Sequence, residues 1–271
     1  MTGRIRAVLA GGVAVVAAVA GFAAPAAAAA EPVDYVALGD SYSAGLGARS
    51  YDPASGDCSR SSNAYPAMWA AANAPATFAF VACSGATTSD VRSEQLSALT
   101  DATDLVTLTV GGNDVGFAPI LATCVIGTDA ACDGGLDTAA FLIDTWLPGA
   151  LAGLYADISA AAPGASVVVV GYPRLFDPAA RSIGKLEPDE QRRMNELAER
   201  LNDRTEAAAT QAGFRFVSVE DSFATHGVGA PEPWVIGLTL RLNESFHPNA
   251  AGQSQGYLPV LQTVTDGSLA G

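Results

Sequence analysis

Short apolar runs alternate along most of the chain with longer segments in which apolar residues recur every three or four positions. Short runs bounded by turn residues are typical of buried strands, and the periodic segments are typical of helices. The run 166–170, one serine and four valines, predicts a buried strand. Met194, Leu197 and Leu201 share one face of a predicted helix. Strands are predicted at 33–38, 77–82, 104–110, 166–170 and 214–219. Helices are predicted at 65–73, 89–99, 115–124, 136–162 with a break at 148–149, 188–212, and from 249 onward.

Three of the predicted strands end in small polar residues. Gly-Asp-Ser-Tyr-Ser follows the first strand at 39–43, Cys-Ser-Gly-Ala-Thr-Thr follows the second at 83–88, and Gly-Gly-Asn-Asp follows the third at 111–114. Strand and helix alternation predicts an α/β fold with a parallel sheet. The carboxyl ends of parallel strands meet at one edge of such a sheet, so these three turns are expected to converge on a site.

Three irregular segments are also informative. The Gly- and Ser-rich stretch 44–63 predicts a surface loop, and the stretch 124–133, between two cysteines, predicts a small closed loop. The segment 235–242 carries Ile236, Leu238 and Leu240 next to Trp234. We interpret this segment as an edge strand or a covering loop, and the alternative is that these side chains line an acyl pocket.

The first thirty residues are typical of a secretory signal peptide. Arg4 and Arg6 precede an apolar core at 7–22, and the alanines at 26–30 provide small residues for cleavage. No later stretch is apolar and long enough to span a membrane. The prediction is therefore a secreted protein without stable membrane insertion, in which 1–30 is the signal peptide and 31–271 is a single domain.

The mature chain is strongly acidic. Its full sequence has 14 Lys and Arg and 28 Asp and Glu residues, and removing Arg4 and Arg6 leaves 12 against 28, a net charge of −16. Nucleic-acid binding requires a basic surface, so this partner is excluded. Attraction to anionic lipid by charge alone is excluded for the same reason. The acidity is interpreted as a contribution to solubility.

Four cysteines follow the signal peptide, and an even number in an oxidising compartment predicts disulfides. Three connectivities are possible, of which Cys58–Cys83 with Cys124–Cys132 is the simplest because it pairs sequence neighbours. A metal site is disfavoured because there is no Cys-x-x-Cys and histidine is scarce.

Ser41 is the candidate nucleophile because it stands at the end of the first predicted strand. The alternative is that Asp40 or Ser41 only caps the following helix. A serine nucleophile needs a general base, and the chain contains two histidines, His226 and His247. Pro248 restricts His247 to an extended backbone and so presents its ring from a fixed loop. His226 has no such setting and is interpreted as structural.

Four motifs occur in the order of one known family and cover almost all of the mature chain. The turn at 39–43 resembles the first motif block of the GDSL, or SGNH, hydrolase family. Gly85 is similar to its second block, 111–114 to its third, and 244–248 to its fifth. The resemblance implies a flavodoxin-like α/β/α sandwich with a five-stranded parallel sheet. Asp114 is interpreted as a helix cap.

The resemblance also implies roles for individual residues. Ser41 is the nucleophile and His247 its general base. The backbone N–H groups of Ser41 and Gly85 and the side-chain amide of Asn113 form the oxyanion hole. The alternative for Gly85 and Asn113 is turn formation and helix capping. The family has aspartate three residues before the histidine, where this chain has Glu244. Glu244 is thus one candidate for orienting His247, and a main-chain carbonyl of 244 or 245 is the alternative that we favour.

The predicted function is a secreted serine ester hydrolase, a lipase or esterase of the kind found among secreted actinobacterial members of this family. It acts as a monomer on a small-molecule or lipid ester and requires no metal or organic cofactor. A carbohydrate acetylesterase on the same fold is the alternative within enzymes. A secreted binding module without turnover is the alternative outside them, and labelling by a fluorophosphonate separates these two classes.

Overall fold

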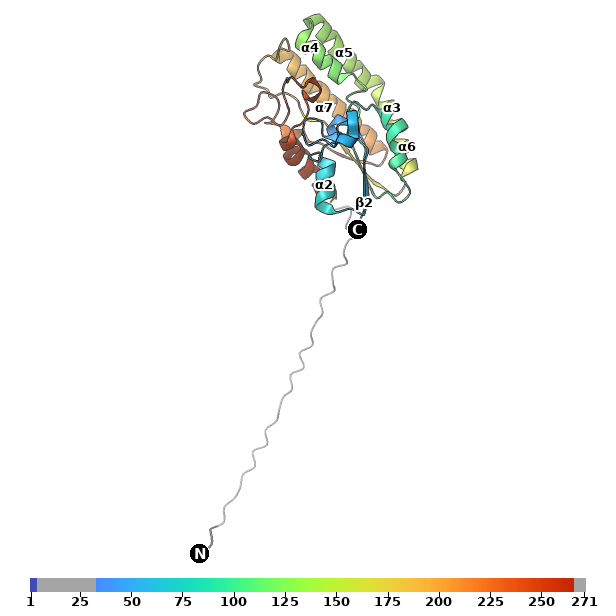
Figure 1. Ribbon diagram of the computed structural model, residues 1–271, viewed down its shortest axis with the longest axis vertical. Helices are drawn as coiled ribbons and strands as arrows, with labels where there is room; N and C mark the ends of the chain where they lie inside the picture. Colours follow the sequence, from blue (N-terminus) through green and yellow to red (C-terminus); the bar gives the residue numbers. More distant parts are fainter. Residues whose placement is uncertain (4–32, 266–271) are drawn as a thin grey trace. The chain divides into compact units, whose positions relative to one another are not determined.

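A five-stranded sheet lies at the centre of the structure, a computed structural model that describes residues 1–3 and 33–265 (Figure 1). The predicted signal peptide therefore lies almost entirely outside the described residues. All neighbouring strands pair in parallel, in the order β2-β1-β3-β4-β5. This topology confirms the predicted α/β fold with a five-stranded parallel sheet. The strands are β1 (Asp34–Ala37), β2 (Thr77–Phe80), β3 (Leu105–Leu108), β4 (Ser166–Val170) and β5 (Arg215–Val217).

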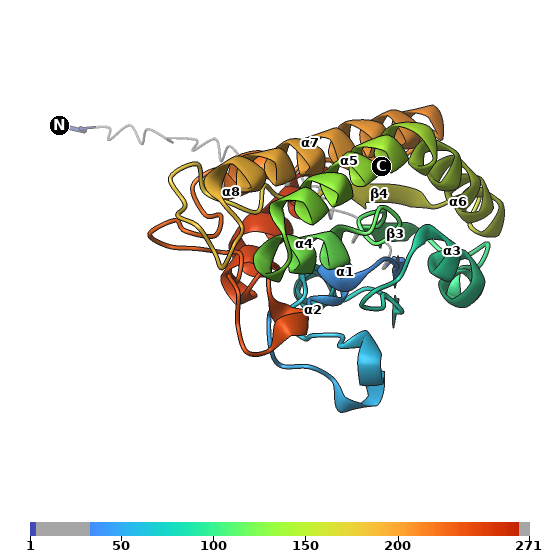
Figure 2. The same cartoon turned by 90° about the horizontal axis from the view of Figure 1, so that it is seen from above.

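Helices cover both faces of this sheet. α2 packs against α9 on one face, whereas α3, α6, α7 and α5 pack against one another on the other face, with α4 lying against α5 (Figures 1 and 2). The α-helices are α1 (Ser41–Ala44), α2 (Tyr65–Asn73), α3 (Thr88–Asp90), α4 (Phe117–Ile126), α5 (Asp129–Thr145), α6 (Leu147–Ala161), α7 (Pro188–Gln211), α8 (Glu220–Phe223) and α9 (Leu258–Thr265). Tighter 3₁₀ turns form η1 (Pro53–Cys58), η3 (Leu96–Ala98) and η4 (Leu242–Glu244), and π-helical turns form η2 (Val91–Gln95) and η5 (Gly252–Tyr257).

The core lies between the sheet and the two helical layers. Val168, Val169 and Val170 of β4 are almost completely buried, as expected for a central strand covered on both sides. Met194 and Leu201 of α7 are buried as well, in agreement with the predicted apolar face. Burying a side chain of this size contributes about 1.5–3 kcal/mol. The rigid sheet that results holds the three polar turns at its carboxyl edge.

The prediction that the segment 124–133 forms a closed loop is wrong. α4 continues to Ile126, and α5 begins at Asp129. Only Gly127 and Thr128 separate the two helices, and the Thr128 side chain accepts a hydrogen bond from the Ala131 amide as an N-terminal cap. The two cysteines thus belong to neighbouring helices, and their spacing indicates a tight helix–helix turn.

Both disulfides of the simplest pairing are present. Cys58–Cys83 joins the end of η1 to the turn after β2, two residues before Gly85. Cys124–Cys132 joins α4 to α5. The first disulfide therefore fastens the long 44–63 loop to the carboxyl edge of the sheet, where the polar turns converge.

No single helix within 33–265 has the length and apolar character needed to cross a lipid bilayer. α5 and α6 reach that length only as a pair, and the pair is bent by 48° at its break.

Candidate active site

Ser41 is the first residue of α1 and follows directly after the turn that ends β1. Gly39 in this turn has a φ of +120°, and a Cβ there would lie 2.5 Å from the carbonyl oxygen of Thr109. Only glycine, which has no Cβ, can adopt this φ and lie this close to the Thr109 carbonyl. Asp40 caps the helix, since its carboxylate accepts a hydrogen bond from the Tyr42 amide at 2.9 Å. The capping interpretation therefore holds for Asp40, and the hydroxyl of Ser41 has a different partner.

That partner is His247. The two side chains are 206 positions apart in the sequence, and the Nε2 of His247 lies 2.8 Å from the Oγ of Ser41. The Nδ1 of the same ring lies 3.0 Å from the carbonyl oxygen of Ser245. A carbonyl only accepts hydrogen bonds, so Nδ1 carries the proton and Nε2 accepts the hydrogen bond of the Ser41 hydroxyl. This is the tautomer that a general base requires.

The protonation state of His247 is suited to the same role. Burial lowers its pKa from 6.5 to about 4, although the Ser245 carbonyl and the negative charge of Glu244 oppose this shift. At neutral pH the imidazole is uncharged and can accept a proton.

A strained turn aims the carbonyl of Ser245 at the ring. The His247 amide donates to the Glu244 carbonyl at 3.3 Å, Ser245 has φ −58° and ψ 139°, and Phe246 has a φ of +63°. These angles describe a type II turn, whose third position is normally glycine. In a type I turn the peptide between Ser245 and Phe246 would be flipped, and the Ser245 carbonyl would point away from the imidazole. The left-handed conformation costs a non-glycine residue about 1–2 kcal/mol.

Burial and two hydrogen bonds hold Phe246 in this conformation. Its side chain is buried and lies near the ring of Phe176, at 5.7 Å between centroids. The hydroxyl of Tyr42 donates to its carbonyl oxygen at 2.9 Å, and its own amide donates to the Ile236 carbonyl at 2.7 Å. Tyr42 follows the proposed nucleophile directly, so the nucleophile turn and the histidine turn are tied together.

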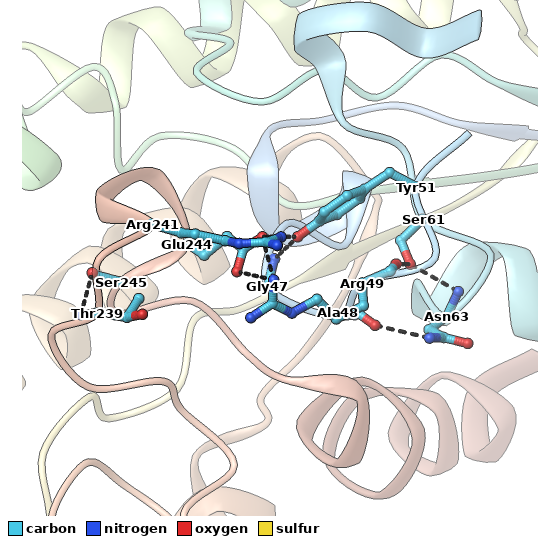
Figure 3. Close-up of polar contacts among 10 residues, drawn as sticks. All are labelled: Gly47, Ala48, Arg49, Tyr51, Ser61, Asn63, Thr239, Arg241, Glu244 and Ser245. Carbon is cyan, nitrogen blue, oxygen red and sulfur yellow. Dashed lines mark hydrogen bonds and ion pairs between the residues drawn. The ribbon is translucent and has the colours of Figure 1, made fainter. Parts of the chain in front are cut away.

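Glu244, at the first position of the turn, has partners other than the histidine (Figure 3). Its carboxylate accepts a hydrogen bond from the Tyr51 hydroxyl at 3.0 Å and lies 3.0 Å from Nη1 of Arg49 and 3.4 Å from Nη1 of Arg241. The side chain of Glu244 is only 3% exposed, whereas those of Arg49 and Arg241 are 53% and 63% exposed. Glu244 therefore anchors the turn to the 44–63 loop, while the Nδ1–H of His247 donates its hydrogen bond to the main-chain carbonyl of Ser245.

The residues expected to bind an oxyanion lie on neighbouring turns. Gly85 has a φ of +85°, and a Cβ there would meet no atom within 4 Å, so the position that a side chain would occupy is open. The side-chain amide of Asn113 donates to the carbonyl of Ala86 at 3.0 Å, beside Gly85. Ser41 and Asn113 both line the same cavity. The structure thus brings the three turns together at the edge of the sheet.

A buried polar network supports this edge. The hydroxyl of Tyr172 donates to the carboxylate of Asp40 at 2.5 Å and accepts from the Gly112 amide at 3.0 Å. Burial raises the pKa of Asp40 to about 7, against the opposing hydrogen bonds from Tyr172 and the Tyr42 amide. Asp114 accepts from the amide of Thr88 at 3.0 Å and from its hydroxyl at 2.7 Å, at the first residue of α3. Asp114 does not cap α4, the helix that follows it, whose N-cap is Gly116 without a side-chain hydrogen bond, so the cap interpretation is wrong; its carboxylate instead satisfies the first amide of α3 from another turn.

Two buried glutamines, which sequence reasoning missed, hold the backbone on either side of Ser41. Gln95 accepts from the Gly39 amide at 2.8 Å and donates to the Gly39 carbonyl at 2.9 Å. Gln253 donates to the Tyr42 carbonyl at 3.0 Å and accepts from the Tyr65 amide at 2.9 Å. Both lie in π-helical turns, η2 and η5, a geometry that is frequent at functional sites. The only signal in the sequence was a polar residue on the buried face of each helix.

A cavity of about 240 Å³ opens beside Ser41 and His247. Its walls are mostly aliphatic and aromatic. The segment 235–242 is a loop and not a regular edge strand, which agrees with one of the two favoured interpretations. Leu238 lines the cavity as the acyl-pocket alternative stated, whereas Trp234, Ile236 and Leu240 do not. Most of the apolar lining comes from α4 and from the segment that precedes the histidine, and the rest comes from the β4–α7 connection and α7: Phe117, Ala118, Leu121, Ala122, Val125, Ile126, Leu238, Leu242 and Phe246, with Pro173, Leu175 and Leu201.

His226 lies outside this arrangement. Its ring stacks on Trp234 with 3.6 Å between centroids, and its Nδ1 lies 2.7 Å from the Glu232 carbonyl oxygen. These contacts agree with a structural role for His226.

Comparisons with known proteins agree on one family. The sequence profile described as the GDSL-like lipase/acylhydrolase family matches residues 37–255. The chain is 47% identical to Lipase 1 of Streptomyces coelicolor over 228 residues, which cover 84% of this chain and 85% of that protein. The crystal structure of an extracellular lipase from Streptomyces rimosus matches with a TM-score of 0.83 and 44% identity, covering 86% of this chain and all of that one. Phospholipase A1 from Streptomyces albidoflavus matches with a TM-score of 0.83 and 45% identity, over 86% of this chain and 99% of that one.

Proposed function

The chain belongs to the GDSL-like lipase/acylhydrolase family and is a carboxylic ester hydrolase, and we propose that it works through an acyl-enzyme on Ser41. One observation carries this proposal. The Ser41 hydroxyl lies 2.8 Å from the Nε2 of His247, and both residues line an apolar cavity.

The first half of the reaction is acyl transfer to the enzyme. The Ser41 oxygen attacks the ester carbonyl while its proton passes to Nε2 of His247. The imidazolium that forms is stabilised by the Ser245 carbonyl on Nδ1, at 3.0 Å. His247 then gives this proton to the departing alkoxide, which leaves as the alcohol. Glu244 anchors the turn that carries this carbonyl.

The negative charge that develops on the carbonyl oxygen requires fixed donors. The backbone amides of Ser41 and Gly85 and the side-chain amide of Asn113 supply three N–H groups. In the second half of the reaction, a water molecule gives its proton to Nε2 of His247 and attacks the acyl-enzyme. Collapse of the second tetrahedral intermediate releases the fatty acid and returns the proton to Ser41.

The cavity favours an acyl chain longer than acetyl. Its wall is built from aliphatic and aromatic side chains of α4, including Phe117, Leu121 and Val125, and these match a hydrocarbon chain. A carbohydrate acetylesterase would leave most of this surface without a partner. The S. albidoflavus relative is a phospholipase A1, so phospholipids belong with simple esters among the substrates to be tested.

We also propose that the protein is secreted as a single catalytic domain after removal of residues 1–30. The charged and apolar pattern of the N-terminal sequence, two disulfides and the extracellular S. rimosus relative support this proposal. Mass determination of the protein recovered from culture medium tests the cleavage site.

Ser41→Ala tests the nucleophile. We expect this variant to lose fluorophosphonate labelling and most hydrolysis of p-nitrophenyl esters, while its thermal unfolding stays near that of the wild type. His247→Ala should also lose turnover, and His226→Ala is the matched control that should retain it. Undiminished hydrolysis by purified Ser41→Ala would refute the assignment. A series of acyl chains from acetyl to palmitoyl, with acetylated xylan and phosphatidylcholine, then separates the esterase, acetylesterase and phospholipase activities.

A further inference from the structure

Four aliphatic side chains at or beside the mouth of the cavity are exposed to solvent. Leu240 is fully exposed, Ile126 and Leu242 are 76% and 72% exposed, and Leu238 is 48% exposed. Ile126, Leu238 and Leu242 line the cavity, and Leu240 lies between the two leucines in the chain. We call these four residues the apolar rim. Scattered single apolar residues need no explanation, but a group beside the opening of an apolar site indicates an interaction surface.

The loop that carries three of the rim residues is fixed to the histidine turn. The Ile236 amide donates to the His247 carbonyl at 2.9 Å, and the Phe246 amide donates to the Ile236 carbonyl at 2.7 Å. Further along, the Thr239 amide donates to the hydroxyl of Ser245 at 3.1 Å (Figure 3). The exposed leucines are therefore held in a defined place beside the catalytic pair.

The position of the rim indicates its occupant. A second copy of the chain on this surface would cover the mouth of the cavity and block the substrate. Four aliphatic side chains also present well under the roughly 800 Å² per partner that a standard protein interface buries. A lipid surface, in contrast, would supply acyl chains directly to the opening. The chain carries twice as many acidic as basic residues, which favours an uncharged or zwitterionic surface over an anionic one.

We propose that the apolar rim inserts into the surface of aggregated, electrically neutral lipid and places the cavity mouth against it. This inference rests on the proposed function, because it takes the cavity as the acyl-binding site. Arg241, between Leu240 and Leu242, has its guanidinium 3.4 Å from the Glu244 carboxylate, so its charge stays at the histidine turn while the leucines enter the acyl region.

Leu240→Ser is the variant of choice because Leu240 belongs to the rim but does not line the cavity. Binding is measured by co-sedimentation with vesicles of ether-linked phosphatidylcholine, which contain no cleavable acyl ester. We expect the vesicle partition coefficient to fall by about tenfold or more, the effect of losing one inserted leucine. Phe141→Ser is the matched control, since Phe141 of α5 is 65% exposed but belongs neither to the rim nor to the cavity, and it should bind like the wild type.

Two further measurements test whether Leu240→Ser is folded and active, and distinguish a failure of this inference from a failure of the proposed function. Leu240→Ser should hydrolyse a monomeric butyryl ester and react with a fluorophosphonate at the wild-type rate. Leu240→Trp should bind vesicles at least as tightly as the wild type, with a blue shift of its added tryptophan emission. Failure of the wild type to hydrolyse the soluble ester would refute the proposed function and leave the vesicle result standing.

Three outcomes would overturn the rim assignment. The first is vesicle binding by the wild type that is no stronger than that of Leu240→Ser, which includes no binding by either protein. The second is an equal loss of binding in Leu240→Ser and Phe141→Ser, which would indicate general surface hydrophobicity. The third is a wild-type dimer that Leu240→Ser converts to a monomer, which would make a second copy the occupant.

Discussion

Replacing Glu244 tests whether its carboxylate anchors the histidine turn or takes part in catalysis. Glu244→Ala removes the acceptor shared by Tyr51, Arg49 and Arg241 but leaves the carbonyl of Ser245 on the histidine ring. Glu244→Gln removes the charge and keeps an oxygen that can accept from Tyr51. The two variants therefore separate the loss of charge from the loss of the anchor.

The size of each effect follows from the exposure of the partners. Both arginines are more than half exposed, so each ion pair contributes about 0–1 kcal/mol to folding after solvent screening. The hydrogen bond from the Tyr51 hydroxyl adds about 1 kcal/mol. Glu244→Ala should thus lower the free energy of unfolding by about 1–3 kcal/mol. The charge of Glu244 raises the pKa of His247, so its loss weakens the base slightly. A fall in kcat within about tenfold is expected, against about 10⁴ for loss of a triad carboxylate.

The assay is kcat on a soluble butyryl ester at equal concentrations of folded, titratable active sites. Fluorophosphonate labelling counts these sites, and urea unfolding measures stability on the same samples. Glu244→Gln should lie between Glu244→Ala and the wild type in both properties. A fall of several thousandfold in kcat for both variants, with the fold intact, would refute the reasoning and make Glu244 the third member of a Ser-His-Glu triad.

Three other changes have defined outcomes. Asn113→Ala should lower kcat by about 10²–10³-fold, the effect of removing one oxyanion donor; loss of stability with unchanged kcat per folded molecule would indicate a turn-forming role only. The pKa of His247 is lowered in the folded protein, so hydrolysis should persist as the pH falls below 6.5 and decline toward pH 4, and an acid limb centred at 6.5 would contradict this. Between pH 6.5 and pH 4 the unfolded chain binds a proton on His247 that the folded protein does not bind. The stability that neutral His247 contributes is therefore present above pH 6.5 and lost toward pH 4. Urea unfolding of His247→Gln and the wild type across this range measures the difference. Reduction should lower the free energy of unfolding by about 3.5 kcal/mol for Cys58–Cys83 and about 2.6 kcal/mol for Cys124–Cys132, from the lengths of the loops they close. The kcat of the molecules that stay folded should not change, and four free thiols in the secreted protein would rule out this effect.

The sequence predicted those parts of the fold that depend on local patterns. The valine run of β4 and the apolar face of α7 follow directly from periodicity, and the observed bounds agree closely with the predicted ones. The convergence of the three polar turns followed from the geometry of parallel sheets. The segment 124–133 was misjudged because two helix ends joined by a short turn carry the same Gly, Thr and Asp residues as a loop.

The contacts that orient the site were beyond reach of the sequence. The side chains of Arg49 and Tyr51 lie in a segment without periodicity, and their common acceptor is almost 200 positions away. Phe246 carries no local sign that it adopts a positive φ, since glycine or asparagine normally marks that position. Such contacts depend on tertiary packing, which the residue pattern of a single sequence does not reveal.

The way Gln253 holds Tyr42 has a consequence for how the protein becomes active. Gln253 reaches back 211 positions to fix the backbone next to Ser41, and His247 comes from the same C-terminal stretch. A chain that has folded only as far as β5 contains the serine but neither the base nor this clamp. On the proposed mechanism, a chain that ends after β5 therefore lacks hydrolytic activity, because the base and the clamp both come from the last part of the sequence.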